Sequence, residues 1–443
     1  MLFRSWQVLE IAQGDSDLDG IALALDAAKA ETDKPSLLIV RTTIGYGSPN
    51  KQGLCASHGS PLGEKEAALT KAELGLDPAQ SFYVAPEAYA QAAKMAARGA
   101  AARSAWEALF ASYERATPEL AAAFNDAIAG RLPAEWSAEI PNFGTEVKLA
   151  TRESSGLVQN AIAKRVPFLI GGDADLSCST KTAINGGGDF EGQGGTGRNI
   201  RFGLREHAMG AIANGLAYHG GVKPFIGTFF MFSGYLLPTL RLAAMNKLPV
   251  VYLFTHDSIQ VGEDGPTHQP IEQLANLRAI PGLLVLRPAD ANETAEAWRV
   301  AMTTKGPVAL ILSRQTLPTL DRTTLAPASE LARGGYVLSE TPGRPAAVLL
   351  ATGAEVHLAF SAQALLAKDG VAVRVVSLPS WELFAAQDAA YRARVLLGAD
   401  VPKVAVEAAS GFGWERFTGA NGALFTVDRY GASAPAGVLL KEF

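Results

Sequence analysis

Cysteine is scarce in this sequence, and its scarcity excludes one class of protein. The chain has 443 residues and only two cysteines, Cys55 and Cys178. A small secreted domain stapled by disulfides needs more, whereas two thiols suit the reducing cytoplasm. The start, MLFRSWQVLEIAQGDSD, becomes polar too soon for a signal peptide. We therefore expect a cytoplasmic protein without a disulfide framework.

Long apolar runs and excess positive charge are also missing. No apolar run reaches the ~20 residues that a membrane-spanning helix needs. The formal net charge is -5, whereas a nucleic-acid-binding protein presents a basic face. We therefore expect neither a membrane nor nucleic acid as a partner. Hydrophobic residues make up 48% and charged residues 19%, which allows a large core, and the length suggests about three domains.

Short apolar runs that end in small or polar residues recur along the chain. They lack period-two alternation, which is typical of strands buried on both faces of a parallel sheet. Ala- and Leu-rich helical stretches, such as 292–302 and 356–370, lie between them. The alternation predicts an α/β fold with doubly wound, mostly parallel sheets in consecutive domains. The predicted strands lie within residues 36–42, 167–173, 250–256, 283–288, 308–314, 346–353, 373–379 and 403–409.

Polar side chains follow several of these predicted strands. Asp173 and Asp175 end one run, and His256 and Arg314 end two others. Ligands of parallel sheets gather at the carboxyl ends of the strands. We therefore expect a functional site at that edge of one sheet.

The segment THDSIQVGEDGPTHQP, residues 255–270, follows the apolar run PVVYLF. His256, Asp264 and His268 suggest a metal site, but Gly265 and Pro266 argue against a helix that would align Asp264 with His268. A polar loop without chemistry is a second interpretation. The third is hydrogen bonding and proton transfer on a polar substrate, for which histidine is suited.

Two other glycine-rich segments have competing interpretations. Gly192, Gly194 and Gly197 match G-x-G-x-x-G, but no predicted strand leads directly into the match, so we expect a flexible loop. In RNIRFGLREHAMGAIANGLAYHGG, residues 198–221, Glu206 starts a predicted helix. It either complements the helix dipole or is a largely buried acid with a raised pKa. His207 and His219 are expected to be structural.

Aromatic and basic residues supply two further candidates. Phe229, Phe232 and Tyr235 are spaced by three, so on a helix they share a face that either packs in the core or stacks on a heteroaromatic ring. Four residues that are scattered in sequence would form a phosphate pocket if they met at one sheet edge. They are Arg152, Ser179, His256 and Arg314.

Taken together, the chain resembles the transketolases, which use thiamine diphosphate. The resemblance covers nearly the whole chain, in family order, and the loop GEDGPTHQP with its THDS prefix is its most specific part. It implies transfer of a two-carbon ketol unit from a ketose phosphate to an aldose phosphate through a carbanion held on the cofactor. The matching segments are IGYGSPNKQGLCASHGSPLG, LATRESSG, GGDADLS, FGLREHAMGAIANG, GTFFMFSGY, THDSIQVGEDGPTHQP, RPADANE, LSRQ and DRYGASAPAGVLLKEF.

The resemblance also implies cofactor contacts. Glu206 would hydrogen-bond N1′ of the aminopyrimidine. Phe232 would stack on that ring, with Phe229 and Tyr235 around it. Asp175 would lie near the cofactor. The family is a homodimer with its active site at the subunit interface, which is the expected partnership here.

The remaining roles concern the sugar. His58 and His268 would contact hydroxyls near the reacting carbons and assist proton transfer, with His58 also near the cofactor. Asp264 would recognise the C2 hydroxyl. The phosphate would be held by Arg152, Ser179, His256 and Arg314.

The sequence departs from the family at both ends. The family's G-D-G motif and downstream asparagine, which bind Mg²⁺ (or Ca²⁺) and the diphosphate, have no match here, so no metal ligand is expected in this chain. We expect residues 1–75 to be the end of the diphosphate-binding domain, 76–145 a helical linker, 146–320 the pyrimidine-binding domain and 335–443 a slightly shortened C-terminal domain. Most of the first domain and the extreme C-terminus would be missing.

The missing part of the diphosphate-binding domain predicts weak cofactor binding and poor catalysis by the chain alone. It also predicts an exposed sheet edge and an exposed apolar surface. A separate N-terminal subunit would then be the required partner. Two other functions are open: dihydroxyacetone synthase, which uses formaldehyde as acceptor, and a non-catalytic fragment that only dimerises.

Overall fold

The computed structural model describes residues 5–191 and 195–443. Gly192 and Gly194 of the glycine-rich match lie outside the described residues. The chain divides into two compact units, one up to Ala111 and one from Ser112 onward. Each unit is described by itself.

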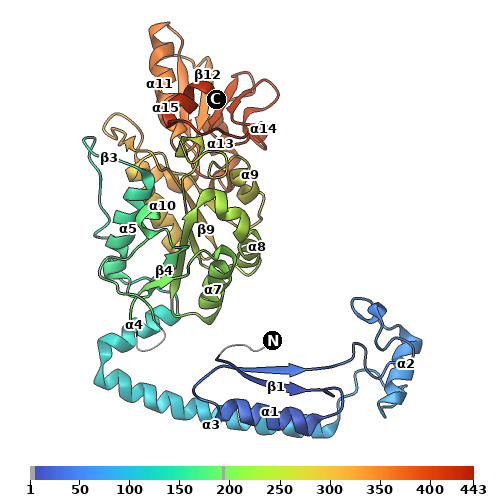
Figure 1. The fold of residues 1–443 in the computed structure, drawn as a ribbon. Coiled ribbons are helices and arrows are strands. Elements are labelled where there is room, and N and C mark those ends of the chain that lie inside the picture. The colour runs from blue at the N-terminus through green and yellow to red at the C-terminus, as the bar shows by residue number, and fades with distance from the viewer. Residues whose placement is uncertain (1–4, 192–194) are drawn as a thin grey trace. The chain divides into compact units, whose positions relative to one another are not determined.

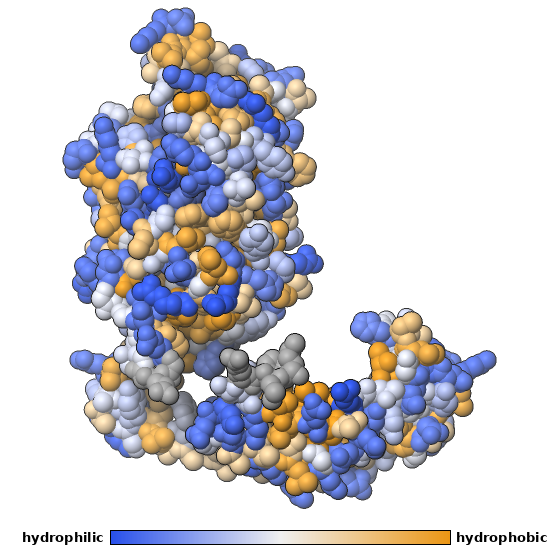
Figure 2. All heavy atoms as spheres, in the orientation of Figure 1, coloured by the Kyte–Doolittle hydropathy of each residue, from blue (hydrophilic) through white to orange (hydrophobic). Residues whose placement is uncertain are grey.

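The N-terminal unit contains a small parallel sheet of β1 (Gln7–Ile11) and β2 (Ser36–Val40). Helix α1 (Leu18–Ala30) joins the strands and begins after Asp17, whose carboxylate accepts a hydrogen bond from the backbone of Gly20. No residue of α1 is buried. Apolar side chains are therefore exposed on this unit, as expected, and Figure 2 shows orange atoms at its surface. Its other elements are η1 (Cys55–Ser57) and α2 (Glu64–Glu73).

The predicted helical tract is helical. It contains α3 (Pro86–Ala116), which crosses the division between the units, and α4 (Pro118–Ile128). Pro118 starts α4, a position where the missing N–H of proline costs no hydrogen bond.

The second unit holds a six-stranded, wholly parallel sheet in the order β5-β4-β6-β7-β9-β8. Every apolar run predicted as a strand in this region is one. Strands β5 and β6 were not predicted. The sequence of β6, KPFIGTF, contains proline and two small residues and continues directly into an aromatic segment. The bounds are β4 (Leu169–Asp173), β5 (Asn199–Arg201), β6 (Lys223–Phe229), β7 (Val251–Thr255), β8 (Leu284–Leu286) and β9 (Val308–Leu312).

Helices cover both faces of this sheet (Figure 1). One face is covered by α5 (Thr151–Arg165) and α10 (Ala291–Thr303). The other is covered by α7 (Glu206–His219), α8 (Leu237–Met245) and α9 (Gln273–Arg278). Burial on both faces explains why the strand sequences are continuously apolar.

A second sheet occupies the C-terminal part, in the order β11-β13-β12-β14-β15. Its strands are parallel except β11, which runs antiparallel to β13. The predicted class of α/β domains with mostly parallel sheets is confirmed. The elements are β11 (Tyr336–Glu340), β12 (Ala347–Ala351), β13 (Val373–Ser377), β14 (Lys403–Glu407), β15 (Ala423–Thr426), α11 (Glu355–Lys368), α12 (Trp381–Ala385), α13 (Ala389–Leu396), α14 (Glu415–Thr418) and α15 (Ala436–Glu442).

Short elements complete the second unit. They are β3 (Lys148–Leu149) and β10 (Leu317–Pro318), which pair antiparallel, and α6 (Ser177–Thr180), η2 (Phe230–Leu236), η3 (Ile259–Val261) and η4 (Ala328–Arg333). Across the described ranges, no helix is both long and apolar enough to cross a membrane. Both cysteines are free and exposed.

Candidate functional site

Three of the predicted phosphate-binding side chains meet at the carboxyl edge of the six-stranded sheet. Arg152 lies in the first turn of α5, Ser179 in α6, and His256 directly after β7. The Nη1 atom of Arg152 donates to Ser179 Oγ at 2.9 Å and to the Ser179 carbonyl at 3.0 Å. The Nε2 atom of His256 lies 3.4 Å from Arg152 Nη1 and 3.3 Å from Ser179 Oγ.

The His256 imidazole is buried and neutral at pH 7. Burial, followed by the charges of Arg152 and Arg314, lowers the pKa of His256 to about 3. Its Nδ1 lies 2.8 Å from Thr255 Oγ1, and its ring centroid lies 3.8 Å from that of Phe229. The backbone of His256 has a φ of 65°, which is unfavourable for a residue with a side chain and is common at functional sites.

Arg314 is exposed, beyond the end of β9. The positive charge of Arg314 acts on both Arg152 and His256, because it helps to lower the pKa of each side chain. The four predicted phosphate ligands therefore lie in one region.

The aromatic residues form an accessible row beside this cluster. Segment η2 is a 3₁₀ helix, in which residues three apart are aligned. Phe229 and Phe232 lie 6.3 Å apart between ring centroids, and Phe232 and Tyr235 lie 6.2 Å apart, both pairs at 17°. Tyr235 is 65% exposed and the two phenylalanines are half-buried. The core-packing interpretation of this face is therefore wrong.

The glycine-containing loop folds back onto the aromatic row. Gly262 and Gly265 have φ values of 90° and 77°, which side chains rarely adopt. The buried Gln269 closes the loop by donating from Nε2 to the carbonyls of Gly262 and Ala432, each at 2.9 Å. This closure brings the His268 ring to 5.4 Å from Phe232.

The remaining predicted residues are more dispersed. Asp264 is exposed within the loop. Glu206 is the first residue of α7, as predicted, and is half-buried rather than largely buried. Asp175 is exposed after β4 with a φ of 66°. His58 is exposed in the N-terminal unit, so its position relative to the other residues is not defined. His207 and His219 are exposed, and neither belongs to the cluster.

The metal interpretation of the loop has no structural support. Residues 5–191 and 195–443 contain no group of three or more His, Cys, Asp or Glu side chains that could hold a metal ion. His256 instead uses both ring nitrogens in contacts with hydroxyls and a guanidinium.

Sequence reasoning missed two buried charged residues next to the cluster, Asp257 and Arg287. Asp257 follows His256, and Arg287 directly follows β8. The available signal was a charged residue at the end of an apolar strand, which pointed to Asp173, Asp175, His256 and Arg314 but was not applied to Asp257 or Arg287.

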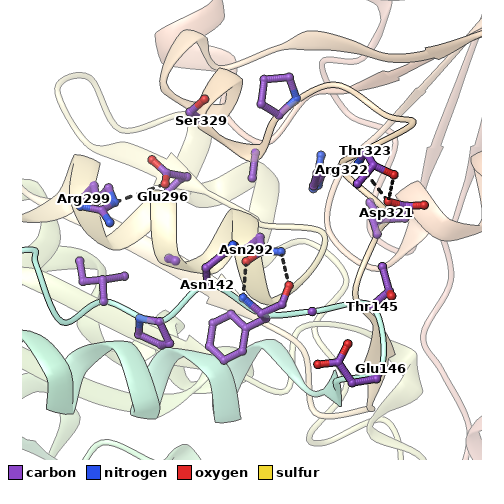
Figure 3. Close-up of a pocket in the computed structure, with 18 residues that line it drawn as sticks. Asn142, Thr145, Glu146, Asn292, Glu296, Arg299, Asp321, Arg322, Thr323 and Ser329 are labelled. Carbon is purple, nitrogen blue, oxygen red and sulfur yellow. Dashed lines mark hydrogen bonds and ion pairs between the residues drawn. The ribbon is translucent and has the colours of Figure 1, made fainter.

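A cavity of about 840 Å³ lies elsewhere in the second unit and contains none of the predicted site residues (Figure 3). Residues 140–146, helix α10 and residues 320–329 line it. Its two arginines are already paired, Arg299 with Glu296 at 3.3 Å and Arg322 with the buried Asp290 at 3.2 Å. We therefore do not assign the functional site to this cavity.

The fold and the edge cluster define a class of protein: consecutive, mostly parallel α/β domains with a cluster of basic and polar side chains at the strand ends. Comparison with known proteins identifies the family. Residues 147–319 match the transketolase pyrimidine binding domain, 3–133 the transketolase thiamine diphosphate binding domain, and 334–443 the transketolase-like C-terminal domain.

Individual relatives agree with these matches. A transketolase of Geobacillus stearothermophilus is 51% identical over 99% of this chain and 66% of its own length. A chloroplastic transketolase of Craterostigma plantagineum is 44% identical over 99% of this chain and 85% of its own length. The structure of a Pichia stipitis transketolase in complex with sedoheptulose 7-phosphate has a TM-score of 0.92 and 39% identity, covering 99% of this chain and 64% of that one.

The chain belongs to the transketolase family. It spans 66% of the length of the Geobacillus relative, just under two thirds. The comparisons do not establish the expected loss of N-terminal and C-terminal parts, which stays a prediction, as do the expected domain boundaries.

Proposed function

We propose that this chain functions as a transketolase, transferring a two-carbon ketol unit from a ketose phosphate to an aldose phosphate. The cluster of Arg152, Ser179 and His256 carries the proposal. It combines a guanidinium, a hydroxyl and a neutral imidazole, and none of the three hydrogen-bonds or ion-pairs with a carboxylate among the described residues. Such a set of uncompensated donors suits a phosphate dianion.

An unpaired buried atom supports the same assignment. The Nε atom of Arg152 is buried and has no hydrogen-bond partner in the described parts of the chain. A buried donor without a partner destabilises the protein. A phosphate oxygen bound here would supply the hydrogen-bond acceptor that this donor lacks.

The aminopyrimidine half of thiamine diphosphate fits the aromatic row. Phe229, Phe232 and Tyr235 offer aligned, accessible ring faces, which suit offset stacking on a flat heteroaromatic ring. We assign the contact with the pyrimidine nitrogen to Glu206 and a nearby position to Asp175. When bound, the cofactor supplies the electron sink that ketol transfer requires.

The sugar itself would contact the loop. Asp264 would accept a hydrogen bond from the C2 hydroxyl, while His268 and His58 would contact hydroxyls near the reacting carbons and move protons there. Side chains that hydrogen-bond substrate hydroxyls discriminate against sugars that leave these side chains unpaired. No described residue is assigned to Mg²⁺, whose ligands we expect outside the matched motifs.

Partnership and location are part of the proposal. We infer a homodimer with the active site at its interface, or pairing with a separate N-terminal subunit. A cytoplasmic location rests on the two free cysteines. Dihydroxyacetone synthase is the alternative enzyme, and a dimerising fragment is the non-catalytic alternative. Acceptor kinetics with formaldehyde and with an aldose phosphate separate the two enzymes.

The experiment is a calorimetric titration of the chain with thiamine diphosphate and Mg²⁺, alone and with a separately expressed N-terminal transketolase domain. We expect cofactor binding and ketol transfer only with the added domain. Glu206→Gln should abolish transfer, while Glu296→Gln on α10 should leave it unchanged. Tight binding by the chain alone would remove the need for a second subunit. No binding under either condition would favour the non-catalytic fragment.

A further inference from the structure

Arg287 lies between the phosphate cluster and the C-terminal domain, and its guanidinium is 1% exposed. Its Nε and Nη2 atoms lie 3.0 and 2.8 Å from the same oxygen of Asp257, the residue after His256. Its Nη1 atom donates to the hydroxyl of Thr352 at 2.9 Å and pairs with Glu355. One guanidinium therefore links the site loop to the C-terminal domain.

The C-terminal domain closes around this guanidinium. Gly353, with a φ of 55°, has no room for a side chain, because a Cβ atom there would lie 2.8 Å from the Cζ atom of Arg287. The backbone N–H of Gly353 donates to the Arg287 carbonyl at 3.0 Å, and the Arg287 N–H donates to Pro379 at 2.9 Å. The arginine is thus held through its backbone as well as its side chain.

A second arginine extends the network. Arg278 on α9 makes a two-pronged pair with Glu407 at 2.8 and 2.9 Å, and Glu407 also accepts from Thr352 and from Trp414. Asp257, Glu355 and Glu407 give the network three carboxylates against two guanidiniums. Burial raises the pKa of Glu355, and the neighbouring Arg287 opposes that shift. The several hydrogen bonds and ion pairs that meet at the two buried guanidiniums hold these side chains in one arrangement.

The backbone at His256 needs such support. Its left-handed conformation is strained and persists only where the surrounding structure enforces it. On one side, Thr255 is fixed as the last residue of β7. On the other side, the contact with Arg287 is what holds Asp257, because the other carboxylate oxygen, Oδ1, has no partner in the described chain.

We propose that Arg287 is a positioning residue: by holding Asp257 against the C-terminal domain, it keeps His256 in the orientation that receives the substrate phosphate. The C-terminal domain thereby sets the affinity for the phosphorylated end of the sugar. The inference rests on the proposed function, because it assumes that the cluster binds phosphate.

The test compares sedoheptulose 7-phosphate with sedoheptulose, by calorimetry and by steady-state kinetics, in the cofactor-loaded assembly. The variants are Arg287→Lys, which keeps the charge and loses the forked geometry, and Asp257→Asn. Asp290→Asn is the matched control, because it makes the same exchange at a fully buried carboxylate that pairs with Arg322 and does not contact the cluster.

We expect both site variants to weaken binding of the phosphate ester about tenfold, since one hydrogen bond to a charged group is misplaced. Binding of the unphosphorylated sugar should not change. In kinetics the KM for the ester should rise while kcat stays nearly constant. Asp290→Asn should lower the melting temperature without changing the preference for the ester. Thr352→Val, which removes only one hydroxyl, should give a smaller shift in the same direction and serves if Asp257→Asn does not fold.

Two results would overturn the proposal. An unchanged ester preference in Arg287→Lys, despite a lower melting temperature, would make the network purely structural. An equal loss of preference in Asp290→Asn would attribute the effect to general destabilisation. If the wild-type protein itself showed no preference for the ester, the cluster would not bind phosphate. That result would contradict the proposed function, whereas the other two results contradict only the role of Arg287.

Discussion

The Oγ atom of Ser179 and the Nε2 atom of His256 lie 3.3 Å apart, although the residues are 77 positions apart in sequence. Their meeting follows from the parallel sheet. Ser179 comes after β4 and His256 after β7, and the ends of parallel strands lie at one edge. Arg152 reaches the same point from the start of α5.

Replacing Arg152 with lysine should separate geometry from charge. Lysine keeps the positive charge but cannot donate at once to Ser179 and to an oxyanion in the same plane. We expect affinity for a ketose phosphate to fall by about 1.5–3 kcal/mol, the usual contribution of a hydrogen bond to a charged group. Calorimetry measures the change, and Arg299→Lys, on α10 beside the unrelated cavity, is the control. A lysine variant with wild-type affinity would show that charge alone suffices.

The low pKa of His256 predicts acid sensitivity. The folded chain holds His256 neutral down to about pH 3, whereas the unfolded chain protonates it near 6.5. The unfolded state therefore binds the extra proton between these values, so stability is complete above pH 6.5 and falls as the pH falls. We expect a loss of about 2 kcal/mol from this residue between pH 7 and pH 5.

Urea unfolding of the wild type and of His256→Gln at both pH values measures this contribution. The difference between the two proteins isolates His256 from His357, whose pKa burial also lowers. If the pH dependence were the same in both proteins, His256 would not be held neutral.

The strands of the six-stranded sheet that were predicted correctly share one property. Runs such as VVYLFT and VALIL are apolar throughout because helices bury both of their faces, so composition alone marks them. Strand β6 was missed because KPFIGTF carries proline, glycine and a buried lysine. Its place between β4 and β7 is set by the sheet and is not visible in its own residues.

The site was predictable in part for a similar reason. His256 and Arg314 stand at strand ends, a local signal, whereas the accessible position of Phe232 depends on the 3₁₀ geometry of η2 and on the loop that folds beside it. The contact of Asp257 with Arg287 joins two strand ends that are 30 residues apart in sequence. The same guanidinium also contacts Thr352, which lies in the C-terminal domain. No short pattern contains that information.

Gly172 in β4 should not tolerate alanine. A Cβ atom there would lie 1.9 Å from the carbonyl oxygen of Ile200 on the neighbouring strand β5. The pairing of β4 with β5 would have to open, which would also displace Asp175 after the strand end. We expect a destabilisation of more than about 3 kcal/mol, because losses of this size are typical of backbone strain or severe overpacking.

Gly215 in α7 is the matched control for this exchange, because a Cβ atom there would meet nothing within 4 Å. Gly215→Ala should stabilise the helix by about 0.5–1 kcal/mol. Thermal unfolding of both variants makes the comparison. Equal melting temperatures would contradict the close approach of β4 and β5.

Lys223 offers a stabilising change at the far end of the same sheet. It begins β6 and is buried, and its ammonium group donates only to the carbonyl of Thr304 at 3.3 Å, with no carboxylate partner in the described chain. Burial lowers the pKa of Lys223 to about 8. The unfolded chain holds this proton up to about pH 10.4, so the folded state is penalised fully below pH 8, and the penalty disappears as the pH rises to 10.4.

Lys223→Met keeps the length of the side chain and removes the buried charge. We therefore expect a gain of about 2–3 kcal/mol in the free energy of unfolding at pH 7, shrinking to near zero above pH 10. Lys305→Met, at an exposed position that lines a pocket together with Lys223, should change stability by no more than about 0.5 kcal/mol. Chemical denaturation at pH 7, 9 and 10.5 follows the trend. A gain that did not depend on pH would mean that packing of the methionine, and not removal of the charge, stabilises the variant.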